Sequence, residues 1–349
     1  MMDLNKELPK IKLMTPKYSN RGTTVIGGKM SGVVNWNDIR YPQMYNTYKN
    51  IVSNFWIPQR IPMTDDVKQW ELLDDTTKQA FLRTIGQVAT LDSVQTRAVL
   101  DFSKYVSEPT YHPIAANIAQ QEATHNESYS YVLSSIVPLS VQNKTFDEAK
   151  NDKIVIKRNQ RVNELYQVFN ENPTPLNFFK ALIGCVVLEG IYFYSAFCFF
   201  YNLARQQKML NTAKMIGYIQ RDEVQHSYFF SQITRYLMDE IPELNNEDNI
   251  KFIYDTIIEA TESEIEWASY SLKNLPGIEL NELYDYIKNL ANRRLRGLGL
   301  DNYYKVSENA MPWMLEFDDD SQDKTKSDLF ESRSTAYKKV NQDNDLDDL

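Results

Sequence analysis

A chain of 349 residues with 42% hydrophobic and 24% charged residues carries enough apolar side chains for a large core, which excludes disorder over most of its length. Its net charge of −9 and pI near 5.1 exclude a basic nucleic-acid surface, because phosphate binding needs clustered Lys and Arg. Only 11 glycines occur, and long stretches rich in Ala, Leu, Glu, Gln and Lys run without proline, so the composition favours an all-α fold.

Cellular location can be predicted from two features of the sequence. Residues 1–21 mix Lys, Asp, Glu and Pro and contain no apolar run typical of a signal peptide. Cys185 and Cys198 lie in one apolar stretch and are predicted to be free thiols in a reducing compartment, which indicates the cytoplasm. That stretch, 181–203, is apolar enough for a membrane span but contains Glu189. We expect a buried helix and no membrane partner.

The chain divides into an arm, a helical domain and a tail. Residues 1–40 are rich in Gly, Pro, Asn and Lys without a sustained period, which predicts an N-terminal arm. Helical periodicity then places one domain at 41–300, with helices expected at 45–56, 74–105, 113–136, 145–169, 176–207, 211–238, 246–273 and 279–296. The period fades after Gly299, and acidic, polar residues predict a flexible C-terminal tail at 301–349.

Two of the three histidines follow a glutamate by three residues, in Glu122-x-x-His125 and Glu223-x-x-His226. With Glu at about one position in fifteen, this coincidence has a chance probability on the order of one per cent. Residues i and i+3 share a helix face, so each pair can direct a carboxylate and an imidazole to one point. A single pair is more often a surface pair or a hydrogen-bonded core histidine, but two pairs on two helices favour a metal site.

Two further acids, Asp92 and Glu189, fall in the middle of apolar helices, where an uncompensated carboxylate is unfavourable. Four carboxylates balance two divalent cations in charge, whereas without metal they would repel one another and take up protons. One carboxylate from each of two helices plus Glu-x-x-His from each of two others is the pattern of ferritin-like di-iron and di-manganese bundles. The sequence therefore predicts such a bundle, and its mixed oxygen and imidazole donors favour iron or manganese.

Five segments around these residues resemble the small, radical-generating subunit of class I ribonucleotide reductase. They are NFWIP at 54–58, TLDSVQ at 90–95, EATHNESY at 122–129, LEGIYFY at 188–194 and RDEVQH at 221–226, and the resemblance extends over roughly 36–337. It implies one site made by Asp92, Glu122 and His125, and a second made by Glu189 and His226, with Glu122 and Glu223 bridging the two metals. No other cofactor is expected.

The same resemblance implies that Tyr129 carries a stable tyrosyl radical. Tyr129 lies four residues after His125, hence on the same face of the helix. Phe193, Phe197 and Ile219 can form an apolar wall that shelters the radical, although ordinary core packing would use them equally well.

Three residues match the family's route for transferring the radical to the large subunit, where nucleotides are reduced. They are Trp56, Asp222 and Tyr337, and Glu331 resembles the acidic residue of the family's tail. Without the resemblance, Trp56 would be interpreted as a core residue and Asp222 as an acid on a helix surface. Tyr337 would be one of 22 tyrosines with no special role.

The C-terminus is predicted to bind the large subunit, with Leu346 and Leu349 filling apolar sockets and the intervening acids steering the peptide. A merely solubilising tail is the alternative. The resemblance also implies a homodimer. Residues around Trp36 and NFWIP resemble class Ib more than class Ia, and class Ib would allow either metal and a small flavoprotein activator. Two other functions stay open, a different ferritin-like dinuclear oxidase and a metal-storage bundle.

Overall fold

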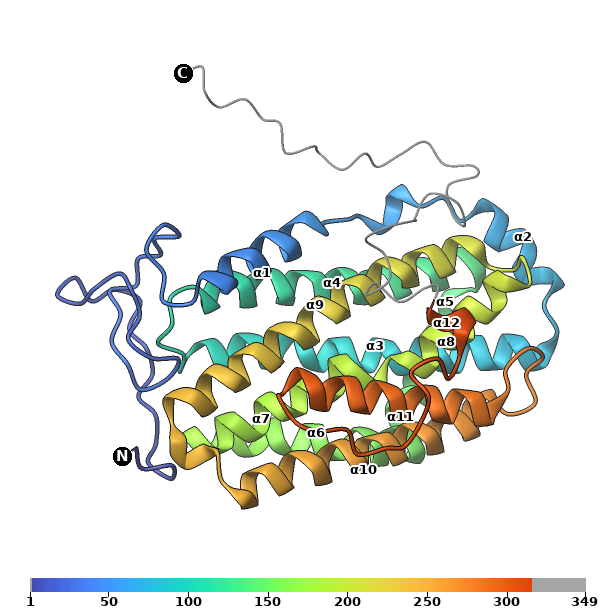
Figure 1. Ribbon diagram of the computed structural model, residues 1–349. Coiled ribbons are helices and arrows are strands. Elements are labelled where there is room, and N and C mark those ends of the chain that lie inside the picture. Colours follow the sequence, from blue (N-terminus) through green and yellow to red (C-terminus); the bar gives the residue numbers. More distant parts are fainter. Residues whose placement is uncertain (1, 316–349) are drawn as a thin grey trace.

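The computed structural model describes residues 2–315, which form an elongated bundle of helices (Figure 1). The helices are α1 Pro42–Ser53, α2 Thr64–Leu72, α3 Asp75–Ser103, α4 Tyr111–Ile136, α5 Leu139–Asn151, α6 Lys153–Glu171, α7 Pro175–Val187, α8 Tyr194–Arg205, α9 Leu210–Glu240, α10 Glu247–Leu272, α11 Leu280–Gly297 and α12 Pro312–Leu315. Short 3-10 turns lie at η1 Pro58–Arg60 and η3 Pro242–Leu244, and a π-helix, η2, lies at Leu188–Tyr192. Within the described range the only β pairing is an isolated bridge between Ile26 and Val106, so the predicted all-α, ferritin-like class is confirmed.

Four long helical segments surround the centre of the bundle. α3 packs along α4, and the α7–η2–α8 segment packs along α9. The remaining long helices form an outer layer, in which α5 lies on α3, α6 on α7, and α10 on α11 (Figure 1). The inner faces of the four central segments therefore have little access to solvent.

Capping residues in the sequence fix several helix starts. The Asp74 carboxylate accepts a hydrogen bond of 2.9 Å from the backbone N–H of Thr77 at the start of α3. Thr174 caps α7 in the same way, and Pro175 follows at the first helical position, where its missing N–H costs nothing. These two caps fix the start of α3, which carries Asp92, and the start of α7, which leads into the π-helix that carries Glu189.

Several details of the predicted helices are wrong. The single helix expected at 145–169 is two helices, because the Asp152 carboxylate accepts backbone hydrogen bonds from Ile154 and Val155 and so begins α6. Helix α4 begins at Tyr111, before Pro113, since proline is tolerated in the first turn of a helix. The short α2 was not predicted.

The apolar segment Pro175–Arg205 is long and apolar enough to cross a membrane, but its most apolar window is completely buried in the bundle. It is therefore the core helix that Glu189 led us to expect. The segment is also not a uniform α-helix, because η2 interrupts it at Glu189.

The N-terminal arm lies against one end of the bundle (Figure 1). The backbone N–H of Leu8 donates to the carbonyl of Pro173 at 2.7 Å, and that of Val25 donates to the Glu240 carboxylate at 2.7 Å. The side chains of Val25 and Ile26 are buried. At the other end of the described range, Met311 and Met314 are buried as well.

Candidate metal centre

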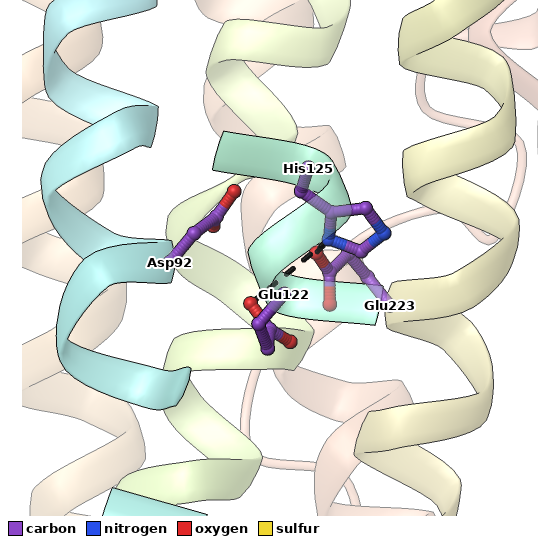
Figure 2. Close-up of side chains that lie close together, drawn as sticks. All are labelled: Asp92, Glu122, His125 and Glu223. Carbon is purple, nitrogen blue, oxygen red and sulfur yellow. Dashed lines mark ion pairs between the residues drawn. The ribbon is translucent and has the colours of Figure 1, made fainter. Parts of the chain in front are cut away.

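All six predicted metal ligands point into the centre of the four-helix core and are fully buried. Asp92 comes from α3, the first Glu-x-x-His pair from α4, Glu189 from η2 and the second pair from α9. The helix spacing brings each pair to one face, as expected from its sequence. Figure 2 shows four of them, Asp92, Glu122, His125 and Glu223, converging from three helices.

These side chains form two groups, in each of which the possible ligand atoms lie within 4.8 Å of one another. The first group is Asp92, Glu122, His125 and Glu223, and the second is Glu122, Glu189, Glu223 and His226. Glu122 and Glu223 belong to both. Two neighbouring ion sites that share two carboxylates are the arrangement of a dinuclear metal centre.

The donor atoms also fit metal ions. Among the described residues, these buried atoms make no hydrogen bond of good geometry, although some lie close to a histidine nitrogen of the cluster: both oxygens of Asp92 and of Glu122, Glu189 Oε2, Glu223 Oε1 and His125 Nδ1. A buried polar atom without a partner is costly, and so many at one point require an explanation. Divalent cations would satisfy all of them. Oxygen and imidazole donors, with no thiolate in either group, suit iron or manganese.

Without metal, the cluster would hold extra protons. Burial, and then the charge of Glu223, raises the pKa of Glu122 to about 8. Burial and the neighbouring Glu122 raise the pKa of Asp92 well above its usual value. Burial lowers the pKa of His226, but Glu223 and the other carboxylates outweigh it, so that pKa is raised overall. Metal binding must therefore displace protons from the site.

Both histidines turn the same ring nitrogen towards the cluster. His125 Nδ1 lies 3.1 Å from Glu223 Oε1, and His226 Nδ1 lies 2.9 Å from Glu122 Oε1. The other nitrogen, Nε2, faces an acceptor outside the cluster, Asp222 Oδ2 for His125 at 3.1 Å and Gln121 Oε1 for His226 at 2.9 Å. Such outer acceptors place the proton on Nε2 and leave Nδ1 free to bind a metal.

Asp222 is the acid that joins the cluster to Trp56. It is fully buried, so the alternative of a helix-surface acid is wrong. Its Oδ2 accepts a hydrogen bond of 2.9 Å from the indole Nε1 of Trp56 and also faces His125. The indole is 7% exposed and its ring centroid lies 6.1 Å from that of His125. A continuous polar contact thus runs from a candidate metal ligand to the indole of Trp56.

Tyr129 is 1% exposed and lies on α4, one turn beyond His125. Burial, followed by the negative charge of Asp92, raises the pKa of its hydroxyl well above 10. The proposed apolar wall residues Phe193, Phe197 and Ile219 are fully buried in the same core. Tyr129 is therefore a neutral phenol in a dry environment beside the cluster.

The π-helix that carries Glu189 is held by a buried ion pair between Arg158 and Glu264. A π-helix leaves backbone groups without their usual partners, and it occurs frequently at functional sites. Arg158 donates to the backbone carbonyl of Tyr192, and Glu264 accepts a hydrogen bond of 3.2 Å from the backbone N–H of Ser195. Arg158 Nε and Glu264 Oε2 are 2.7 Å apart. Two outer helices, α6 and α10, thus fix the local geometry at Glu189.

Gly190 follows Glu189 because the side chain of Arg294 occupies the adjacent space. A Cβ at position 190 would lie 2.5 Å from Arg294 Cδ. Arg294 Nε donates to the Gly190 carbonyl at 3.1 Å. This glycine provides a close approach of α11 to the π-helix.

Gln121 and the Arg158–Glu264 pair were not predicted from the sequence. Gln121 lies four residues before His125, so helix spacing places it on the side of the cluster, and that signal was available. Arg158 and Glu264 are 106 positions apart and gave no local signal. Tyr337, Glu331, Leu346 and Leu349 lie outside the described residues.

Comparison with known proteins identifies the family. Residues 33–312 match the family described as ribonucleotide reductase, small chain. The chain belongs to this family. Its resemblance to the small subunit, noted from five short segments, is thereby confirmed.

Similarity to members of the family extends over almost the whole chain. The ribonucleoside-diphosphate reductase subunit beta of Halalkalibacterium halodurans is 40% identical over 346 residues, which cover 99% of this chain and 100% of that protein. The corresponding subunit of Treponema pallidum is 34% identical over 319 residues, 90% of each chain. The solved structure of the ribonucleotide reductase R2 subunit from Clostridium botulinum superposes with a TM-score of 0.86 at 32% identity, covering 89% of this chain and 99% of that one.

Proposed function

We propose that this protein is the radical-generating subunit of a ribonucleoside-diphosphate reductase, an oxidoreductase of deoxyribonucleotide synthesis. The observation that carries the proposal is the pair of buried ligand groups sharing Glu122 and Glu223, in a chain 40% identical over its length to a subunit beta. Family membership does not favour the two alternatives, a different dinuclear oxidase and a metal-storage bundle.

In this function Asp92, Glu122 and His125 would hold one ion and Glu189 and His226 the other, while Glu122 and Glu223, which belong to both ligand groups, would be shared between them. A bound and oxidised metal pair supplies a one-electron oxidising equivalent. Tyr129 would lose one electron to that oxidising equivalent and its phenolic proton to the neighbouring Asp92 carboxylate, and would keep the radical. Its burial supports this role, because water and reductants are excluded from the phenol.

Radical transfer to the large subunit would use Trp56, Asp222 and Tyr337. The hydrogen bonds that join Trp56 and His125 through Asp222 support the first part of the route. Tyr337, beyond the described residues, would continue it, and the C-terminal tail would bind the large subunit.

The donor set suits both iron and manganese, so metal availability decides between them. A class Ib subunit carrying manganese would need a flavoprotein activator. The protein is proposed to act as a cytoplasmic homodimer, and its two cysteines, both free thiols, fit a reducing compartment.

The test is electron paramagnetic resonance (EPR) of protein loaded with iron and exposed to oxygen, or loaded with manganese and activated by oxygen and a reduced flavoprotein. We expect a tyrosyl signal that disappears in Tyr129→Phe while metal content stays the same. The wild-type protein, mixed with the large subunit, should reduce ribonucleoside diphosphates. A signal that persists in the variant would place the radical on another residue, and two bound metals without nucleotide reduction would favour an oxidase.

A further inference from the structure

A second chain of buried hydrogen bonds reaches the cluster on the side of Glu189. Gln95 Nε2 donates to Glu189 Oε1 at 2.5 Å. Gln95 Oε1 in turn accepts a hydrogen bond of 2.8 Å from the hydroxyl of Tyr166, which also lies 3.2 Å from Cys185 Sγ. Gln95, Cys185 and Glu189 have no solvent exposure, and Tyr166 is 4% exposed.

The chain of contacts fixes which way the Gln95 amide points. An amide has an accepting oxygen and a donating nitrogen, and the Tyr166 hydroxyl has a single proton to donate. Because the Glu189 carboxylate can only accept, the amide nitrogen faces it, and the amide oxygen is left to accept from Tyr166. The Cys185 thiol can donate a hydrogen bond to the Tyr166 oxygen. Neither Tyr166 nor Cys185 then donates to Glu189.

The two oxygens of Glu189 are consequently different. Oε1 accepts the Gln95 hydrogen bond, whereas Oε2 has no hydrogen-bond partner among the described residues and lies 3.9 Å from His226 Nδ1. Oε2 is thus the free donor atom of the second ligand group. Gln95 lies three residues after Asp92, so the helix that supplies one ligand also positions another.

We propose that Gln95 and Tyr166 are positioning residues that make Glu189 bind the second metal through Oε2 alone. A carboxylate that binds through one oxygen leaves open a coordination position that a chelating carboxylate would fill. Gln95 and Tyr166 therefore keep one coordination position of the second metal open to a small molecule. The inference rests on the proposed dinuclear centre but not on the radical or on its transfer.

The test compares wild type with Gln95→Met and Tyr166→Phe. Gln95→Met keeps similar volume and removes the amide, and Tyr166→Phe removes only the hydroxyl. Tyr111→Phe is the matched control, because Tyr111 is another fully buried tyrosine and its hydroxyl has no hydrogen-bond partner among the described residues. Metal-free protein is titrated with Mn(II), and free Mn(II) is measured by its EPR signal. Infrared spectra record the carboxylate stretches.

Wild type is expected to take up two Mn(II) ions per chain. In Gln95→Met, the uptake of one ion should weaken by ~10- to 100-fold, as for other residues that orient metal ligands. Glu189 Oε1 becomes free to chelate, so the separation between antisymmetric and symmetric carboxylate stretches should narrow. Tyr166→Phe should change both measurements in the same direction but less, and Tyr111→Phe should match wild type.

Unchanged titrations and infrared spectra in both variants would overturn the proposal, as would an equal weakening of both ions, which indicates a general structural effect. If circular dichroism shows that Gln95→Met does not fold, the infrared spectrum and Mn(II) titration of Tyr166→Phe test the proposal. Wild-type protein that binds fewer than two ions would instead refute the dinuclear centre itself. The wild-type titration thus tests the proposed centre, and the variants test the positioning role of Gln95 and Tyr166.

Discussion

The indole nitrogen of Trp56 lies 2.9 Å from Asp222 Oδ2, although the two residues are 166 positions apart in the sequence. The same oxygen lies 3.1 Å from His125 Nε2. A single carboxylate oxygen therefore fixes the tautomer of a candidate metal ligand and holds the indole against it.

Replacing Asp222 and replacing Trp56 should have different effects on the protein. Asp222→Asn keeps the shape but removes the charge that orients His125, so we expect metal affinity and activity to fall by ~10- to 100-fold. Trp56→Phe leaves the His125 contact intact, so metal content and the Tyr129 EPR signal should persist while nucleotide reduction with the large subunit is lost. Full turnover by Trp56→Phe would exclude Trp56 from the transfer route.

The stability of the metal-free protein should depend on pH in a direction set by Glu122. Its pKa is raised to about 8 in the folded protein, against a usual value near 4.5. The folded state then binds more protons than the unfolded state between these values, so stability falls as pH rises from about 5 to about 8. The raised pKa of His226 acts in the same direction above its usual 6.5.

This dependence can be measured by thermal unfolding with and without Mn(II). Because metal displaces protons from the site, the stabilisation by Mn(II) should be larger at pH 8 than at pH 6. Glu122→Gln should flatten the pH dependence of the metal-free protein. A metal-free protein that gains stability from pH 5 to pH 8 would contradict the protonated state of the cluster.

The Arg158–Glu264 pair should matter far more than its neighbour on the same two helices. Glu264→Gln leaves Arg158 buried without its counter-charge, which typically costs about 3–5 kcal/mol of unfolding free energy. Lys157 and Glu266, 2.6 Å apart but both about half exposed or more, form the matched control. Glu266→Gln should cost at most about 1 kcal/mol. Equal losses in urea unfolding would show that burial of the pair has no special role.

The C-terminal nine residues should be required for nucleotide reduction with the large subunit but not for assembly of the metal centre or the radical. Deletion of 341–349 should leave metal uptake and the tyrosyl signal unchanged and abolish nucleotide reduction. Replacing Leu346 and Leu349 by serine should have the same effect if apolar sockets hold them, while Asp347→Asn should mainly weaken binding at low salt and lower its salt sensitivity. Full activity of the deletion variant would exclude the tail from large-subunit binding.

Local spacing accounts for what could be predicted. Glu122 and His125, like Glu223 and His226, lie three residues apart, and the helix period alone places each pair on one face. Asp92 and Glu189 could be recognised because a carboxylate in an apolar helix is unfavourable without a partner. The all-α class followed from the composition, and the buried position of the apolar 181–203 segment followed from the presence of Glu189 within it.

Other features depend on contacts between distant segments. The break at Asp152 was missed because helical periodicity continues on both sides of it, and only the side-chain cap separates α5 from α6. The π-helix at Glu189 has no period of its own in the sequence. Its geometry depends on Arg158 and Glu264, which reach it from two outer helices.

The sequence by itself determined the helical class, the six candidate ligands and the family resemblance, because each depends on residue type and spacing within one helix. Only the tertiary structure placed Asp222 between Trp56 and His125 and Gln95 between Tyr166 and Glu189. These contacts join different helices, so they depend on how the helices pack and on which buried donors meet which acceptors.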